Sequence, residues 1–136
     1  FNRKYTCHVS KKLDVEAMRE VSKVLIGEHD FTSFCSSRSK KKSHVREIYS
    51  ITINEKDDIL EIYVEGNGFL YNMVRIIAGT LIQVGAGERS PQEMKEILEA
   101  KNREAAGPTA PAKGLTMIGI EFEKILDTHG SVYYNI

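Results

Sequence analysis

The sequence has little of what supports disulfides, metal centres or membrane spans. Its two cysteines, Cys7 and Cys35, stand alone without the close spacing of metal ligands, so we interpret them as reduced thiols in a cytoplasmic protein. Its four histidines are scattered, and no Ser–His–Asp order is visible. The apolar runs are far too short to cross a bilayer, and no signal-peptide pattern opens the chain. We therefore predict a protein without a metal site and without a membrane span.

What is present is an ordinary globular composition with an uneven distribution of charge. The 136 residues are 41% apolar and 28% charged, which predicts one domain with a buried core. The net charge is zero, but residues 1–46 carry eleven Lys or Arg against five Asp or Glu, whereas residues 47–136 carry eight against fourteen. The positive excess is greatest in "SRSKKKSHVR" (37–46), a run without an acid that favours contact with a phosphate backbone. A solvated loop is the alternative interpretation. The basic residues of the run are Arg38, Lys40, Lys41, Lys42 and Arg46.

Apolar periodicity and capping residues predict the secondary structure. Asp14 is a favourable N-cap for a first helix, and Gly27 is a natural stop for it. Ser90 and Glu93 have the spacing of a capping box at the start of a later, short helix, in which a proline occupies the first position. The predicted strands are 3–9, 45–54, 59–66 and 115–123, and the predicted helices are 13–27, 69–84 and 90–101.

The order of these elements predicts the fold class. Apart from the short extra helix it is βαββαβ, the ferredoxin-like order of an α+β domain, with a four-stranded antiparallel sheet and helices on one face. In the first hairpin strand, Tyr49, Ile51 and Ile53 are expected to share one face. We predict one domain over 1–126 and a tail without assignable pattern over 127–136.

The helix predicted at 69–84 contains one unexpected charge, Arg75. On a helical wheel Arg75 lies opposite the core stripe, near Tyr71, Gly79 and Ile82, on a face that is neither plainly polar nor charged. Such a face is expected to contact a second domain or subunit, and an arginine there requires a carboxylate or phosphate. The alternative is an exposed arginine whose stem covers its apolar neighbours. The core stripe comprises Leu70, Met73, Val74, Ile77, Leu81 and Val84.

Three segments carry a resemblance to a known family. "GEHDFTSF" (27–34), "GNGFLYNMVRIIAGTLIQVGAGE" (66–88) and "REAAGPTAPAKGL" (103–115) occur in the order and spacing of the C-terminal half of the TruA family of tRNA pseudouridine synthases. The resemblance covers about 13–122, nearly the whole chain. The "FLYNMVR" block followed by "VGAGE" and "APAKGL" is specific to that family.

The resemblance implies a function and a set of site residues. Members of the family isomerise uridine to pseudouridine in the anticodon arm of tRNA, as homodimers without metal or organic cofactor, by means of a nucleophilic aspartate. Arg75 matches the arginine that pairs with that aspartate. Tyr71, Met73 and Val74 are candidates to line the pocket of the extruded base, although Met73 and Val74 are equally consistent with a core. The run 37–46 and Lys113 are candidates to contact tRNA phosphates, although a proline-stiffened connection around Lys113 is the alternative.

The sequence departs from the family at the catalytic group. The family's aspartate lies in a "GRTD-x-GVHA"-type motif of its N-terminal half, and neither this motif nor the "R-x-Y-x-Y" block of the base-stacking tyrosine occurs here. Together with the start at Phe1, this predicts a C-terminal domain that lacks its N-terminal domain and is inactive alone.

Two other functions fit parts of the sequence. A non-catalytic RNA-binding module of ferredoxin-like fold is the main alternative, although the RNA-recognition string K/R-G-F/Y-G/A-F-V-x-F/Y is absent. A regulatory domain that binds a small anion at the glycine-framed helix start is a weaker one.

Overall fold

The computed structural model describes residues 1–9, 12–36, 41–111, 115–118, 124–126 and 132–134. Its strands form one five-stranded antiparallel sheet, in the order β2-β3-β4-β1-β5, and a separate hairpin of β6 and β7. The strands are β1 (Asn2–His8), β2 (Gly27–Asp30), β3 (Val45–Lys56), β4 (Ile59–Gly66), β5 (Leu115–Ile118), β6 (Lys124–Leu126) and β7 (Val132–Tyr134).

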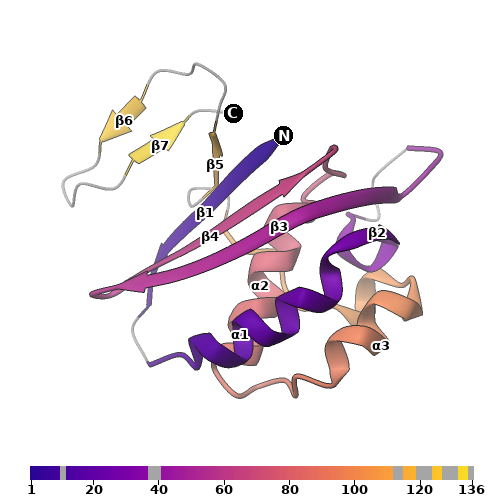
Figure 1. Cartoon of the computed structure of the whole chain (residues 1–136), viewed down its shortest axis with the longest axis horizontal. Helices are drawn as coiled ribbons and strands as arrows, with labels where there is room; N and C mark the ends of the chain where they lie inside the picture. The colour runs from indigo at the N-terminus through magenta and orange to yellow at the C-terminus, as the bar shows by residue number, and fades with distance from the viewer. Residues whose placement is uncertain (10–11, 37–40, 112–114, 119–123, 127–131, 135–136) are drawn as a thin grey trace.

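The helices lie on one side of this sheet (Figure 1). Their apolar faces, with those of the sheet strands, form the core, in which Met18, Leu60 and Ile77 are fully buried. The helices are α1 (Val15–Ser22), α2 (Met73–Gly85) and α3 (Glu93–Ala100), with the short 3-10 segments η1 (Lys23–Leu25), η2 (Thr32–Phe34) and η3 (Arg103–Ala105).

The predicted ferredoxin-like arrangement is confirmed by four of the strands. β3, β4, β1 and β5 are neighbours in that order, which is the arrangement expected for the βαββαβ sequence. Three strands were not predicted: β2, which pairs with the outer edge of β3, and β6 and β7, which pair with each other. The strands of the second pair lie on either side of position 127, where the sequence analysis began a tail.

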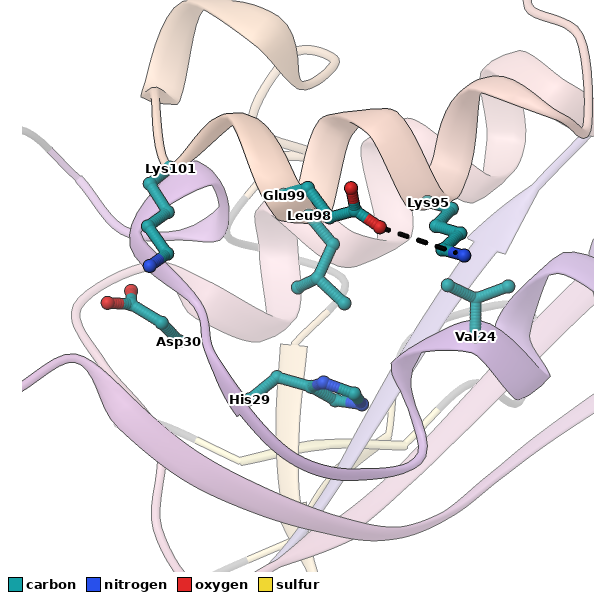
Figure 2. A pocket seen from close by; sticks show the side chains of 7 residues that line it. All are labelled: Val24, His29, Asp30, Lys95, Leu98, Glu99 and Lys101. Carbon is teal, nitrogen blue, oxygen red and sulfur yellow. Dashed lines mark ion pairs between the residues drawn. The ribbon is translucent and has the colours of Figure 1, made fainter.

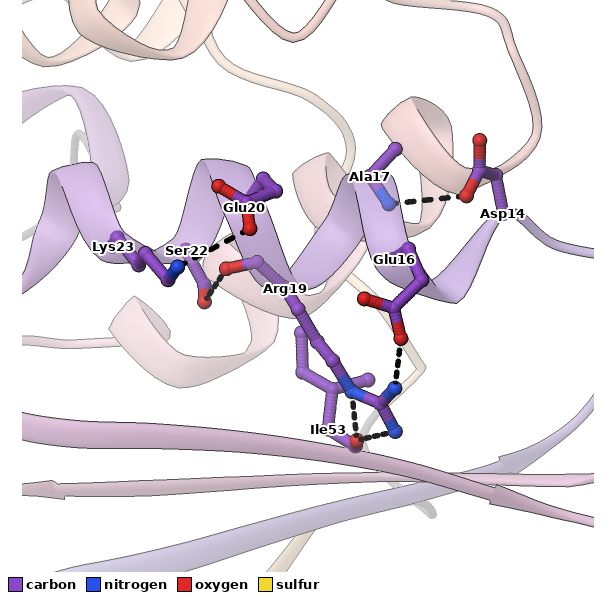
Figure 3. A network of polar contacts seen from close by, with 8 residues as sticks. All are labelled: Asp14, Glu16, Ala17, Arg19, Glu20, Ser22, Lys23 and Ile53. Carbon is purple, nitrogen blue, oxygen red and sulfur yellow. Dashed lines mark hydrogen bonds and ion pairs between the residues drawn. The ribbon is translucent and has the colours of Figure 1, made fainter.

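Local sequence signals set the start of α1 as predicted. The Asp14 carboxylate accepts a hydrogen bond from the backbone N–H of Ala17 over 3.0 Å, which satisfies one of the unpaired donors of the first turn. Arg19 then reaches the sheet, where its Nε and Nη2 donate to the carbonyl of Ile53 on β3 over 2.9 and 2.8 Å (Figure 3). Glu16 pairs with the same guanidinium. The helix is thereby held to β3 by a paired charge.

The start of α3 follows its predicted capping box in part. The Glu93 carboxylate accepts from the backbone N–H of Ser90 over 2.8 Å, as the box requires. The Ser90 hydroxyl accepts from the N–H of Gln92 over 3.3 Å, and the helix begins at Glu93, two residues beyond the proline.

The predicted face of β3 is wrong at Tyr49. A β-bulge between Ile48 and Ser50 shifts the register against β4, so that Ile48 is buried and Tyr49 is 50% exposed, whereas Ile53 stays in the core. Because side chains alternate along a strand, one extra residue reverses the face of everything on one side of it.

Candidate active-site surface around Arg75

The chain leaves the sheet at Gly66 and enters α2 through a tight connection. Gly66 lies so close to β3 that a Cβ atom there would stand 2.6 Å from the carbonyl oxygen of Glu47. At the other end of the connection, Asn72 adopts the left-handed conformation with φ of 59° and accepts the N–H of Ile76 at its carbonyl. Asparagine tolerates this conformation better than most residues, so the sequence supports the turn into the helix.

Arg75 lies in the first turn of α2 and is half-buried. Its Nε donates to the carbonyl oxygen of Ala110 over 2.7 Å, and its Nη1 donates to Oδ1 of Asn72 over 3.0 Å. Both acceptors are neutral, and within the described part of the chain Arg75 forms no ion pair. The alternative of an exposed, solvated Arg75 is therefore wrong, because two acceptors hold its guanidinium against the protein. Its charge nevertheless stays uncompensated among the described residues, which favours an external anion as its partner.

Ala110, the carbonyl acceptor of Arg75, belongs to a segment that we call the strap, residues 107–110. The strap crosses α2 so closely that a Cβ atom at Gly79 would stand 1.9 Å from the carbonyl oxygen of Pro108. Its last residue also donates, from the N–H of Ala110 to the carbonyl oxygen of Arg75 over 3.0 Å. This part of the outer face of α2 is thus covered by the protein's own chain, where the sequence predicted a second domain or subunit. Because Gly79 has no side chain, this side of α2 leaves room for the backbone of the strap.

The strap is also fixed at its beginning. The N–H of Gly107 donates to the hydroxyl of the fully buried Thr80 over 2.9 Å, and that hydroxyl donates to the carbonyl of Ile76 over 2.8 Å. From the outside, Arg103 donates to the carbonyl of Gly107 over 2.9 Å and to the hydroxyl of Thr109 over 3.1 Å. These contacts were not predicted, because no local pattern in the sequence marks them.

Two aromatic residues lie near the same end of α2. Tyr5 on β1 is buried, and burial, with the Cys7 thiol nearby, raises its pKa to about 12 against the opposing effect of the Arg75 charge. Two residues earlier, the guanidinium of Arg3 stacks on the ring of Phe69 at 5.2 Å, and partial burial lowers the pKa of Arg3. Sequence analysis missed Arg3; only its position on the same face of β1 as Tyr5 connects it to this region.

The three residues predicted to line a base pocket differ in exposure. Tyr71 is 56% exposed, and its carbonyl anchors the N–H of Ser36 over 3.0 Å. Met73 and Val74 are buried in the core, where the Met73 sulfur accepts from the N–H of Leu70 over 3.5 Å. Tyr71 therefore presents its side chain to solvent, whereas Met73 and Val74 belong to the core.

The predicted basic run reaches the same region through Arg46. Its Nη1 donates to the carbonyls of Ser43 and Val45 over 3.0 and 2.7 Å, and its Nε lies 3.7 Å from the position of a Cβ atom at Gly68. Lys41 and Lys42 are exposed. The predicted residues Arg38, Lys40 and Lys113 lie outside the described residues.

A pocket of about 260 Å³ lies elsewhere, between α3, β2 and η1 (Figure 2). Asp30 and Lys101 point toward each other at the rim of this pocket. Lys95 and Glu99 form an ion pair beside Leu98, with 3.8 Å between Nζ and Oε1. The hydroxyl of Thr32 donates to Asp30 and holds the pKa of that carboxyl below its usual value. None of the predicted site residues lines this pocket.

Comparison with known proteins decides the family. Residues 21–123 match the family model described as tRNA pseudouridine synthase. The chain belongs to the tRNA pseudouridine synthase family. Similar relatives are the tRNA pseudouridine synthases A of Bacillus pumilus (56% identical over 115 residues), Brevibacillus brevis (53% over 117) and Bacillus subtilis (51% over 123). These matches cover 85%, 86% and 90% of this chain and 47%, 48% and 50% of the relatives. The chain therefore spans about half the length of the curated relatives it matches.

Further properties of the chain concern metal sites, membrane spans and cysteines in its described part. No group of three or more His, Cys, Asp or Glu side chains there could hold a metal ion, and no helix there has the length and apolarity of a membrane span. Both cysteines are free thiols, Cys7 half-buried and Cys35 buried.

Proposed function

We propose that this chain forms one wall of the catalytic cleft of an enzyme that isomerises uridine to pseudouridine in the anticodon arm of tRNA. The observation that carries the proposal is Arg75: half-buried, fixed by two neutral acceptors, and without a countercharge among the described residues. In the proposed enzyme this guanidinium pairs with a nucleophilic aspartate from an N-terminal domain. The pair keeps the carboxylate ionised and aimed at the glycosidic bond, which breaks before the uracil rejoins the sugar through carbon.

The surroundings of Arg75 support a nucleic-acid substrate. Tyr71 offers an exposed ring on which an extruded base stacks, with Met73 and Val74 forming the apolar layer behind it. Lys41, Lys42 and Arg46 contact backbone phosphates, as do Arg38, Lys40 and Lys113. The complete enzyme works as a cytoplasmic homodimer, and its chemistry needs no metal or organic cofactor.

The decisive experiment uses a chimaera in which this chain replaces the matching segment of the Bacillus pumilus relative. We expect the chimaera to form pseudouridine in a tRNA transcript. We expect Arg75→Ala to reduce the rate by about 100-fold or more, because a preorganised charge beside the nucleophile is lost. Arg75→Lys should rescue little, since an ammonium cannot reproduce the two directed N–H bonds.

Arg19→Ala is the matched control. Arg19 is also a partly exposed helical arginine that donates to a backbone carbonyl, but it lies on α1 and is paired with Glu16. Its loss should lower stability and leave the rate of the folded chimaera unchanged. An Arg75→Ala chimaera as active as the parent would refute the proposed role.

The 136-residue chain alone should bind tRNA and form no pseudouridine. If the chimaera were also inactive while the chain bound tRNA, the alternative of a non-catalytic RNA-binding module would be favoured.

A further inference from the structure

The position of the Arg75 guanidinium is set by the strap, which contacts α2 through its backbone. Ala110 accepts from Nε of Arg75 and returns a hydrogen bond from its own N–H to the Arg75 carbonyl. A residue bonded at both its backbone and its side chain to one neighbour has little freedom to re-aim its side chain. The strap therefore determines where the charge of Arg75 points.

We propose that Thr80 and Gly79 are positioning residues for Arg75, which they fix through the strap. The proposal rests on the proposed function for its catalytic meaning, but the geometry is independent of it. Neither residue touches the guanidinium. Each sets the distance between α2 and the strap, one by a hydrogen bond and the other by the absence of a side chain.

Thr80 supplies the hydrogen bond. Its buried hydroxyl accepts the N–H of Gly107 and donates to the carbonyl of Ile76, so both of its directed bonds are used. Removing the hydroxyl leaves the buried N–H of Gly107 unpaired, which costs more than the bond itself contributes. The strap is then free to shift away from the helix, and Ala110 moves with it.

Gly79 supplies the close approach. The position of its missing Cβ is 1.9 Å from the carbonyl oxygen of Pro108, and this oxygen belongs to backbone rather than to a flexible side chain. Any side chain at Gly79 therefore displaces the strap. By contrast, a Cβ atom at Gly85 on the same helix would meet the Met18 sulfur at 2.5 Å, and that side chain can rotate.

The primary test is hydrogen exchange of the Arg75 Nε–H in the labelled 136-residue chain, measured by NMR. We expect Thr80→Val to speed this exchange by about tenfold, as loss of one bond of ordinary strength predicts, and Thr80→Ser to leave it near the parent value. Gly79→Ala should speed it as well, and Gly85→Ala should not. Arg103→Gln, which loosens the strap from the outside without altering the core, should act like Thr80→Val and decides the matter if a core variant unfolds.

The catalytic consequence is measured in the chimaera. Thr80→Val should lower kcat by about tenfold with KM for tRNA unchanged, and Thr80→Ser should restore kcat. Unchanged Arg75 exchange in Thr80→Val, Gly79→Ala and Arg103→Gln would refute positioning by the strap, whatever the activity. If the Arg75 exchange in the chain responds as expected but the rate of the chimaera does not depend on Arg75, the proposed function is refuted and the positioning of Arg75 by the strap is retained.

Discussion

Arg75 and Arg19 are held in similar ways by the protein, but among the described residues only Arg19 has a carboxylate partner. Both are helical arginines whose guanidinium donates to a distant backbone carbonyl. Arg19 has the Glu16 carboxylate beside it, so its role is completed within the fold. Arg75 has the Asn72 amide oxygen in the corresponding place, which orients the group without neutralising it. A fixed but uncompensated charge is what a site for an incoming carboxylate requires.

Tyr5 gives a prediction about pH. Burial raises its pKa to about 12, above the usual value of 10.0, so the folded state favours the neutral phenol. This stabilisation is complete below about pH 10 and is lost as the pH rises through 12, because the unfolded chain ionises first. We expect the free energy of unfolding to fall by on the order of 2 kcal/mol over that range through Tyr5. Urea denaturation of the parent and Tyr5→Phe at several pH values checks this, and identical pH profiles would contradict it.

At the scale of elements, the register of β3 is testable by a pair of truncations. Ile48→Ala should reduce the free energy of unfolding by about 2–4 kcal/mol, because it leaves a cavity in the core. Tyr49→Ala should cost less than about 1 kcal/mol, since half of that side chain is already in solvent. Both values come from urea denaturation. A larger loss for Tyr49→Ala would mean that the strand has no bulge and follows simple alternation.

The elements themselves could be predicted where their causes are local. The Asp14 cap, the β3–β4 hairpin and the apolar stripe of α2 depend on residues a few positions apart, and all three are present. The bulge at Ile48 could not be predicted, because β3 has large apolar residues at both alternating sets of positions, so the sequence does not say where the buried face changes from one set to the other. β2 could not be predicted either, since a strand of four residues has too short a pattern.

At the scale of the whole molecule, the site combines segments that are distant in the sequence. Arg75 could be recognised in the sequence as the single charged residue of an apolar helix. Its acceptor Ala110 lies 35 positions away and contributes only its backbone. A backbone contact of this kind leaves no chemical signature at Ala110. The sequence does mark the place on α2 that the strap crosses, since Gly79 leaves room there for the carbonyl of Pro108, but we interpreted that room as space for another domain or subunit.

The charge distribution of the molecule gives the last prediction. Arg46 lies where the basic run meets the connection between β4 and α2, and Lys42 is an exposed residue of the same run, so we expect both to contact tRNA phosphates. Binding should then weaken steeply with salt, since each contact releases counterions. Lys42→Ala and Arg46→Ala should each reduce the slope of log affinity against log salt by about 1. Lys56→Ala, at the opposite end of β3, is the control of equal charge and should leave the slope unchanged. Filter binding of the chain to a tRNA transcript at several salt concentrations measures the slopes. Equal slopes for all three variants would show that the charge of the chain acts diffusely rather than through this corner of the sheet.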